Sequence, residues 1–189
     1  MSNENPASRP AGEAQFAVWL RPSEPQYGRF QAIIRELARS HGTPLFAPHV
    51  TLISGRKHDE LRLPEKIARW AGEQPPLSLA AGPIDVTDER FRALFLSLVP
   101  GESQALFSRA RGELSIDSDF RPHLSLMYTQ DLPRARKEGI ARDLIDRLPD
   151  KEIHFDALQL VESGLHVWDD VTAWRVLQTN LLNLSQRKC

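Results

Sequence analysis

The chain has 189 residues and a mass of 21.4 kDa, which suits one domain or two small lobes that share a core. Its formal net charge is −1, so it lacks the basic excess of proteins that coat long nucleic acids. The only cysteine is the last residue, Cys189, which excludes an intrachain disulfide and a cysteine-based zinc site and favours a cytoplasmic setting.

The predicted elements follow from apolar spacing, because strands alternate every two residues and helices repeat every three to four. In chain order they are a strand over 15–20, a helix from 25 that stops at Gly42, a strand over 49–54, a helix over 63–72, strands over 77–86 and 92–99, a helix over 103–114, a strand over 122–128, a helix over 133–148, and strands over 152–162 and 172–178. The polar residues 87–90 join two of these strands, which predicts a hairpin or adjacent strands. Interleaved helices and short strands of this kind predict an α+β fold with antiparallel sheets.

The chain ends differ from the rest in composition. Residues 1–14 are rich in Ser, Asn, Glu, Pro and Gly, and they predict a disordered tail. A single domain is predicted over 15–180 and a C-terminal tail over 181–189. No stretch approaches the roughly 20 apolar residues of a transmembrane helix, so no membrane association is expected.

One octapeptide pattern occurs twice in the chain. Residues 46–53 read FAPHVTLI and residues 120–127 read FRPHLSLM, so both fit Phe-x-Pro-His-apolar-Thr/Ser-Leu-apolar. Each copy lies in a predicted strand, where alternate side chains point to the same face. Each strand is therefore expected to show one imidazole and one hydroxyl on one face, while the apolar residues between them point into a core.

The repeated residues suit acid–base chemistry on a phosphate ester. His49 and His123, with pKa values ordinarily near 6.5, can serve as general base and general acid at neutral pH. The hydroxyls of Thr51 and Ser125 can donate to phosphoryl oxygens. A single histidine on a strand is more often structural, but the duplication with matched hydroxyls favours catalysis. The motifs are almost symmetric and do not assign the two proton-transfer roles.

A zinc site at the two histidines is the main alternative at the level of the residues. Such a site needs a further ligand, and no carboxylate stands at matching spacing in the two motifs. Hydroxyl partners suit phosphate better than a metal ion. No metal and no cofactor are therefore expected.

The paired motifs resemble the H-x-[ST]-x signature of the 2H phosphoesterase superfamily, and within it the cyclic phosphodiesterase branch. The segments that carry this likeness are Val18-Trp19-Leu20, PHVT at 48–51 and PHLSLMY at 122–128. The resemblance implies a bilobal fold with two pseudo-symmetric lobes and antiparallel sheets around a central cleft. It also implies metal-independent hydrolysis, with Trp19 and Tyr128 as possible substrate contacts.

The resemblance further implies a small-molecule substrate. We expect a monomer that hydrolyses ADP-ribose 1″,2″-cyclic phosphate or a nucleoside 2′,3′-cyclic phosphate to the 1″- or 2′-monophosphate, without extended nucleic-acid binding. RNA-end processing, as in the RNA 2′,3′-cyclic phosphodiesterase or 2′-5′ RNA ligase branch, is an alternative. It is disfavoured by the early break of the apolar run at residues 53–55 and by the slightly acidic chain. A nucleotide-binding module without turnover is the third hypothesis.

Overall fold

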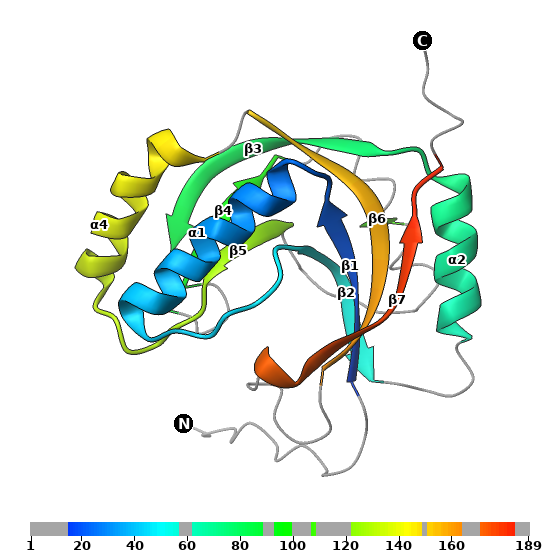
Figure 1. The fold of residues 1–189 in the computed structure, drawn as a ribbon, viewed down its shortest axis with the longest axis horizontal. Helices are drawn as coiled ribbons and strands as arrows, with labels where there is room; N and C mark the ends of the chain where they lie inside the picture. The colour runs from blue at the N-terminus through cyan, green and yellow to red at the C-terminus, as the bar shows by residue number, and fades with distance from the viewer. Residues whose placement is uncertain are drawn as a thin grey trace, which may run out of the picture.

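The computed structural model describes residues 15–56, 62–88, 93–99, 107–108, 122–148, 151–163 and 171–183 (Figure 1). Its elements are β1 (Gln15–Pro22), α1 (Gln26–His41), β2 (Val50–Arg56), α2 (Leu63–Glu73), β3 (Leu77–Val86), β4 (Leu94–Leu98), β5 (His123–Met127), α4 (Arg134–Leu144), η3 (Ile145–Arg147), β6 (Glu152–Ser163), η4 (Val171–Ala173) and β7 (Trp174–Leu181). The predicted α+β class is confirmed. The helix predicted over 103–114 lies outside the described residues except for 107–108, as do the predicted N-terminal tail at 1–14 and residues 184–189.

The described strands form one antiparallel sheet with the order β1-β2-β5-β4-β3-β6-β7. Along one edge β6 pairs with β1, and along its other edge it pairs first with β3 and then with β7. The sheet therefore curls until β1 and β6 pair. The described strands form one continuous sheet, whereas the resemblance implies separate sheets around a cleft. Among the described residues, β2 and β5 pair through Val50 and Leu124.

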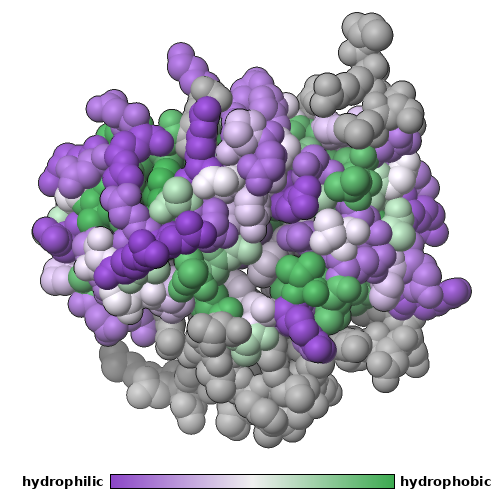
Figure 2. Space-filling view, viewed as in Figure 1, coloured by the Kyte–Doolittle hydropathy of each residue, from purple (hydrophilic) through white to green (hydrophobic). Residues whose placement is uncertain are grey.

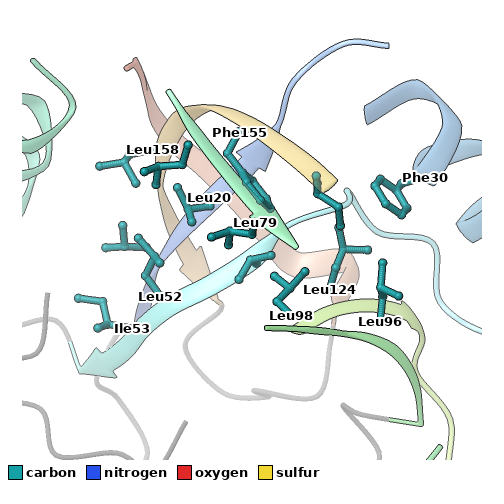
Figure 3. Close-up of a cluster of buried hydrophobic side chains, with 14 of the residues drawn as sticks. Leu20, Phe30, Leu52, Ile53, Leu79, Leu96, Leu98, Leu124, Phe155 and Leu158 are labelled. Atoms are coloured by element: carbon teal, nitrogen blue, oxygen red, sulfur yellow. The ribbon is translucent and has the colours of Figure 1, made fainter. Parts of the chain in front are cut away.

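The core lies inside this curled sheet and under the helices. Leucines and a phenylalanine from many strands converge there, as Figure 3 shows for Leu20, Leu52, Leu79, Leu124 and Phe155. Each of these side chains is almost fully buried, and burial of such a side chain contributes about 1.5–3 kcal/mol. Because Leu52 and Leu124 face the core, the intervening motif residues face the other side of the sheet.

The three described α-helices pack on the core side of the sheet, where they contribute Phe30, Ile67 and Ile140 to the core. In Figure 1, α1 and α4 lie on the side of β3, β4 and β5, and α2 lies beside β6 and β7. Figure 2 shows mostly hydrophilic side chains on this face of the molecule, with apolar patches among them. The exposed apolar residues of β7 are Val176, Leu177 and Leu181. No helix among the described residues is long and apolar enough to cross a membrane.

The connection from α1 to β2 positions the first motif. Gly42 ends α1 as predicted, with a φ of 64° that glycine adopts without steric cost, and its N–H donates to the carbonyl of Ala38. The chain then turns back along the helix. There the Gln31 side-chain amide donates to the Phe46 carbonyl at 3.0 Å. This contact ties the start of the first octapeptide to α1.

The described residues include three beyond the domain end predicted at 180. Leu181 completes β7, and Leu182 is 2% exposed. The backbone N–H of Asn183 donates to the carbonyls of Ala71 and Gln74 at the end of α2. An apolar residue in the core and these hydrogen bonds hold the start of the segment predicted as a C-terminal tail.

Candidate active site

The two motif strands are neighbours in the sheet, and this brings the repeated residues together. Val50 of β2 pairs with Leu124 of β5 in antiparallel register. When this antiparallel register is extended by one residue in each direction, His49 lies opposite Ser125 and Thr51 lies opposite His123. The four polar side chains therefore share the face opposite the core, arranged with approximate twofold symmetry about the Val50–Leu124 pair.

His49 lies directly before β2 and is enclosed by neighbouring groups. Its side chain is 4% exposed, and its Nδ1 lies 2.7 Å from the carbonyl oxygen of Ala47. The indole ring of Trp19 stacks on the imidazole with 3.6 Å between ring centroids and 12° between planes. When Nδ1–H donates to the Ala47 carbonyl, Nε2 is the nitrogen left to exchange a proton with a substrate.

Burial controls the charge of this imidazole. Desolvation lowers the pKa of His49 from 6.5 to about 4, with a smaller contribution from the positive charge of His123, while the hydrogen bond to Ala47 opposes the shift. His49 is therefore neutral near pH 7 when no substrate is bound. The contribution of His123 also shows that the two imidazoles lie close enough to interact electrostatically.

His123 has different surroundings, although its motif is the same. It is only partly buried, and the ring of Phe95 meets it edge-on at 5.1 Å and 63°. On β4, Ser97 pairs with His123 of β5. The Ser97 hydroxyl donates to the carboxylate of Asp85 on β3. The near-symmetric motifs thus place one histidine in an aromatic, buried setting and the other beside a polar pair.

Phe95, Ser97 and Asp85 were not predicted as site residues. Phe95 pairs with Ser125 and Asp85 pairs with Phe95, so the three lie on the same face of the sheet as the motif residues. In the sequence, Phe95 and Ser97 alternate with buried leucines, which marks a face but not a site. Only the pairing of β4 with β5 reveals their place.

Tyr128 follows the second motif strand and supports Ser125. Its ring is 5% exposed and stacks on Phe46 with 4.1 Å between centroids. Its hydroxyl is hydrogen-bonded to the hydroxyl of Ser125, and burial raises the pKa of Tyr128 well above its usual value near 10. The tyrosine therefore stays protonated and can orient the serine.

Trp19 and Trp174 complete an aromatic wall around His49. Trp19 is 4% exposed, and one of its faces is covered by the imidazole. Trp174, at the start of β7, meets Trp19, His49 and Tyr128 edge-on, with centroid distances of 5.6, 6.0 and 6.0 Å. Trp174 lies outside both motifs, and the sequence carries no signal for its role. Substrate contact by Trp19 and Tyr128 stays a prediction, and both residues are placed to hold motif side chains.

Among the described residues, no group of three His, Cys, Asp or Glu side chains lies together as metal ligands do. The polar groups of the site are the two imidazoles and the hydroxyls of Thr51, Ser125 and Ser97, with the Asp85 carboxylate beside Ser97. Such a set can exchange protons at two points and donate hydrogen bonds to an anion between them.

The chain is similar to known proteins in sequence and in fold. The family model of the 2′-5′ RNA ligase superfamily matches residues 21–166, which include both motif strands. Escherichia coli LigT, in a crystal structure with phosphate, is 15% identical, and the match covers 92% of this chain and 99% of LigT with a TM-score of 0.56. The protein TT0787 of Thermus thermophilus is 17% identical over 89% of this chain and 97% of that protein, with a TM-score of 0.59. At these identities the structures support the fold. A search of curated protein sequences finds no match.

Proposed function

The chain belongs to the 2′-5′ RNA ligase superfamily, whose members are 2H phosphoesterases, and we propose that it hydrolyses a small cyclic phosphate diester with His49 and His123 as the acid–base pair. One observation carries this proposal. The antiparallel Val50–Leu124 pair brings both imidazoles and both motif hydroxyls onto one face of the sheet. A phosphate centred above that pair has a histidine on either side.

The reaction needs two proton transfers on opposite sides of phosphorus. Water attacks the phosphorus while one imidazole removes its proton, and the bond from phosphorus to one ribose oxygen breaks. The other imidazole, protonated, gives its proton to that leaving oxygen, so the product is a phosphate monoester with a free ribose hydroxyl. The twofold arrangement of the motifs supplies the in-line geometry, and Thr51 and Ser125 donate to the non-bridging oxygens.

Substrate binding changes the protonation of the buried histidine. In the substrate-free enzyme His49 is neutral, because its desolvated imidazole resists a positive charge. A phosphate anion next to the ring and the π face of Trp19 both favour the imidazolium form. The pKa of His49 therefore rises when a phosphate occupies the site. Which histidine protonates the leaving group depends on which ribose oxygen faces it.

The substrate we propose is a nucleoside 2′,3′-cyclic phosphate or ADP-ribose 1″,2″-cyclic phosphate, opened to the 2′- or 1″-monophosphate. The net charge of −1 supports a small ester over a long polyanion. RNA ends that carry a 2′,3′-cyclic phosphate are a second candidate, which the family assignment favours. Comparing kcat/KM for a cyclic mononucleotide and for an oligonucleotide ending in the same group separates the two.

The test is hydrolysis of a nucleoside 2′,3′-cyclic phosphate in EDTA, followed by phosphorus NMR to identify which ester bond opens. His49→Ala and His123→Ala are each expected to lose a factor of about 10² to 10⁴ in kcat. His154→Ala, a substitution of an exposed histidine outside the motifs, is the matched control and should retain wild-type activity. Wild-type turnover by either motif variant contradicts the two-histidine mechanism. Tight nucleotide binding by the wild type with no product identifies a binding module instead.

A further inference from the structure

A cavity lies on the core side of β3 and β4, away from the histidines. Its volume is about 730 Å³, and it opens between β3 and the helical segment α4–η3. Its wall is mostly apolar and includes Ile84, Val86, Leu96, Ala141, Ile145 and Leu148. Cavities of about 300–1,000 Å³ with such walls are typical binding sites for small ligands.

A bulge in β3 opens this space. The pairing between β3 and β4 shifts between Ala81 and Ile84, so Gly82 and Pro83 have no regular partner on β4. At Gly82 the strand passes so close to β4 that a Cβ atom would lie 3.2 Å from the carbonyl oxygen of Ser97. A bulge bends its strand, and here Gly82 and Pro83 themselves line the cavity.

The charges at the rim do not balance. Glu138, Arg142 and Lys151 line the cavity, and the Glu138 carboxylate already accepts a hydrogen bond from the Arg134 guanidinium at 3.0 Å. No carboxylate of the described residues forms an ion pair with Arg142 or Lys151. Two cations, Arg142 and Lys151, therefore border an apolar chamber without an ion-pair partner among the described residues.

We propose that this cavity binds an amphipathic anion, with a hydrocarbon body against the apolar wall and a carboxylate or phosphate head between Arg142 and Lys151. Burial of the hydrocarbon provides the affinity, and the two cations select the charge of the head group. Lys151 is held at the rim because its backbone carbonyl accepts a hydrogen bond from the N–H of Ala81 at 2.8 Å.

The site is separate from the histidine face. Leu96 lines the cavity, while its neighbours Phe95 and Ser97 point to the opposite face and lie against the second motif strand. A ligand in the cavity and a cyclic phosphate at the histidines thus bind on opposite faces of β4. They do not compete for space, and the binding test stands whether or not the proposed hydrolysis is correct.

The test is calorimetric titration of the full chain with decanoate and with decyl phosphate below their micelle concentrations. Decanol and decylammonium are the head-group controls. We expect one molecule of an anionic ligand to bind per chain, and the tighter of the two identifies the preferred head. Binding of decylammonium as tight as that of decanoate overturns the proposal, and so does the absence of binding by either anion.

Variants locate the site. Ala141→Phe fills the cavity and should abolish binding, whereas Ala135→Phe, on an exposed position of the same helix, should not. The double substitution Arg142→Glu/Lys151→Glu should weaken decanoate binding about tenfold and leave decanol binding unchanged. Arg39→Glu on α1 is its surface control. Thermal unfolding midpoints confirm that each variant is folded, and wild-type affinity in folded Ala141→Phe places the ligand elsewhere and contradicts the proposal.

Discussion

His49 combines deep burial, a stacked indole and a backbone hydrogen bond in one side chain. The stacked indole and the backbone hydrogen bond keep Nε2 aimed away from the strand, and burial makes the neutral ring the resting state of the enzyme. His123 has the same motif but a more open setting beside Phe95 and Ser97. The two halves of the repeat are therefore chemically unequal, and this inequality can be measured residue by residue.

The first prediction concerns stability against pH. The pKa of His49 is about 4 in the folded chain and near 6.5 when unfolded, so above pH 6.5 the ring is neutral in both states. As the pH falls from about 6.5 to about 4, the unfolded chain takes up a proton that the folded chain resists. The fold then loses about 3 kcal/mol through this one group.

Urea unfolding at pH 7, 5.5 and 4 measures that loss. His49→Gln should remove this part of the pH dependence, whereas His154→Gln, with an exposed side chain outside the site, should not. An identical pH dependence in the wild type and His49→Gln would show that burial of His49 does not set its charge.

The second prediction distinguishes the hydroxyls that donate to the substrate from the tyrosine that orients one of them. Thr51→Val and Ser125→Ala each remove a donor to the phosphoryl group and should lower kcat by about 10² to 10³. Tyr128→Phe removes only the hydrogen bond that orients Ser125, so kcat should fall less and KM should change little. If Tyr128→Phe loses as much kcat as Ser125→Ala, the tyrosine itself touches the substrate.

The third prediction tests Trp19 as a positioning residue. Trp19→Leu removes the stacked ring, so the imidazole of His49 should lose its fixed orientation and kcat should fall more than KM rises. Trp19→Phe keeps an aromatic face and should restore most of kcat. An NMR titration of His49 provides a second readout, because loss of the indole should shift the pKa of His49. A large rise in KM alone would instead indicate that Trp19 contacts the substrate.

Several site residues could be predicted from the sequence because they lie in a local pattern. His49, Thr51, His123 and Ser125 follow strand alternation after a proline, and no tertiary information is needed to place each pair on one face. Trp174 and Ser97 reach the site only through strand pairing between distant segments. Local spacing holds no record of such pairing, which is why these residues were missed.

At the scale of elements, α4 is fastened to the end of β3 by a buried lysine. Lys137 is 1% exposed, and its ammonium donates to the Thr87 carbonyl at 2.6 Å and to the Asp88 carboxylate at 2.9 Å. The Asp88 side chain is largely exposed, and the ammonium lowers its pKa. The sequence shows Lys137 in the charged run 134–138, which predicts a solvated helix face, and the burial of Lys137 corrects that prediction for this residue.

The fourth prediction follows from this contact. Lys137→Ala leaves a cavity and removes both hydrogen bonds, so the free energy of unfolding should fall by about 3 kcal/mol in urea titrations. Lys137→Met fills the space and removes the buried charge, and it should lose less than half as much. Lys66→Ala, on a half-buried position of α2, is a control for loss of a lysine from a helix. Equal losses in the two Lys137 variants would show that the hydrogen bonds, and not packing, dominate.

Element types and their approximate limits followed from hydrophobic periodicity, as the clear helix over Gln26–His41 and the alternating strand over Glu152–Ser163 illustrate. The order of the strands did not, because it depends on which distant edges meet. The bulge at Gly82–Pro83 could be suspected from its residues, but its consequence, a cavity beside α4, needs the position of the helix.

At the scale of the whole molecule, the curled sheet brings the two copies of one motif into contact. Among the described residues, β2 and β5 pair directly through Val50 and Leu124. The sheet also connects these strands the other way round, through β3, β6 and β1. The separation of the two imidazoles is therefore set by how the sheet curls. Two copies of a short motif, 74 positions apart, become one site only in the folded chain.

The pH profile of kcat/KM for a nucleoside 2′,3′-cyclic phosphate, measured in EDTA, tests the central claim most directly. Paired histidines predict a bell: activity falls at low pH as the base is protonated and at high pH as the acid loses its proton. His49→Gln and His123→Gln should each lower the whole curve and remove one of its two limbs. A wild-type profile that is flat between about pH 5 and 8, or a bell that persists in both variants, contradicts the account.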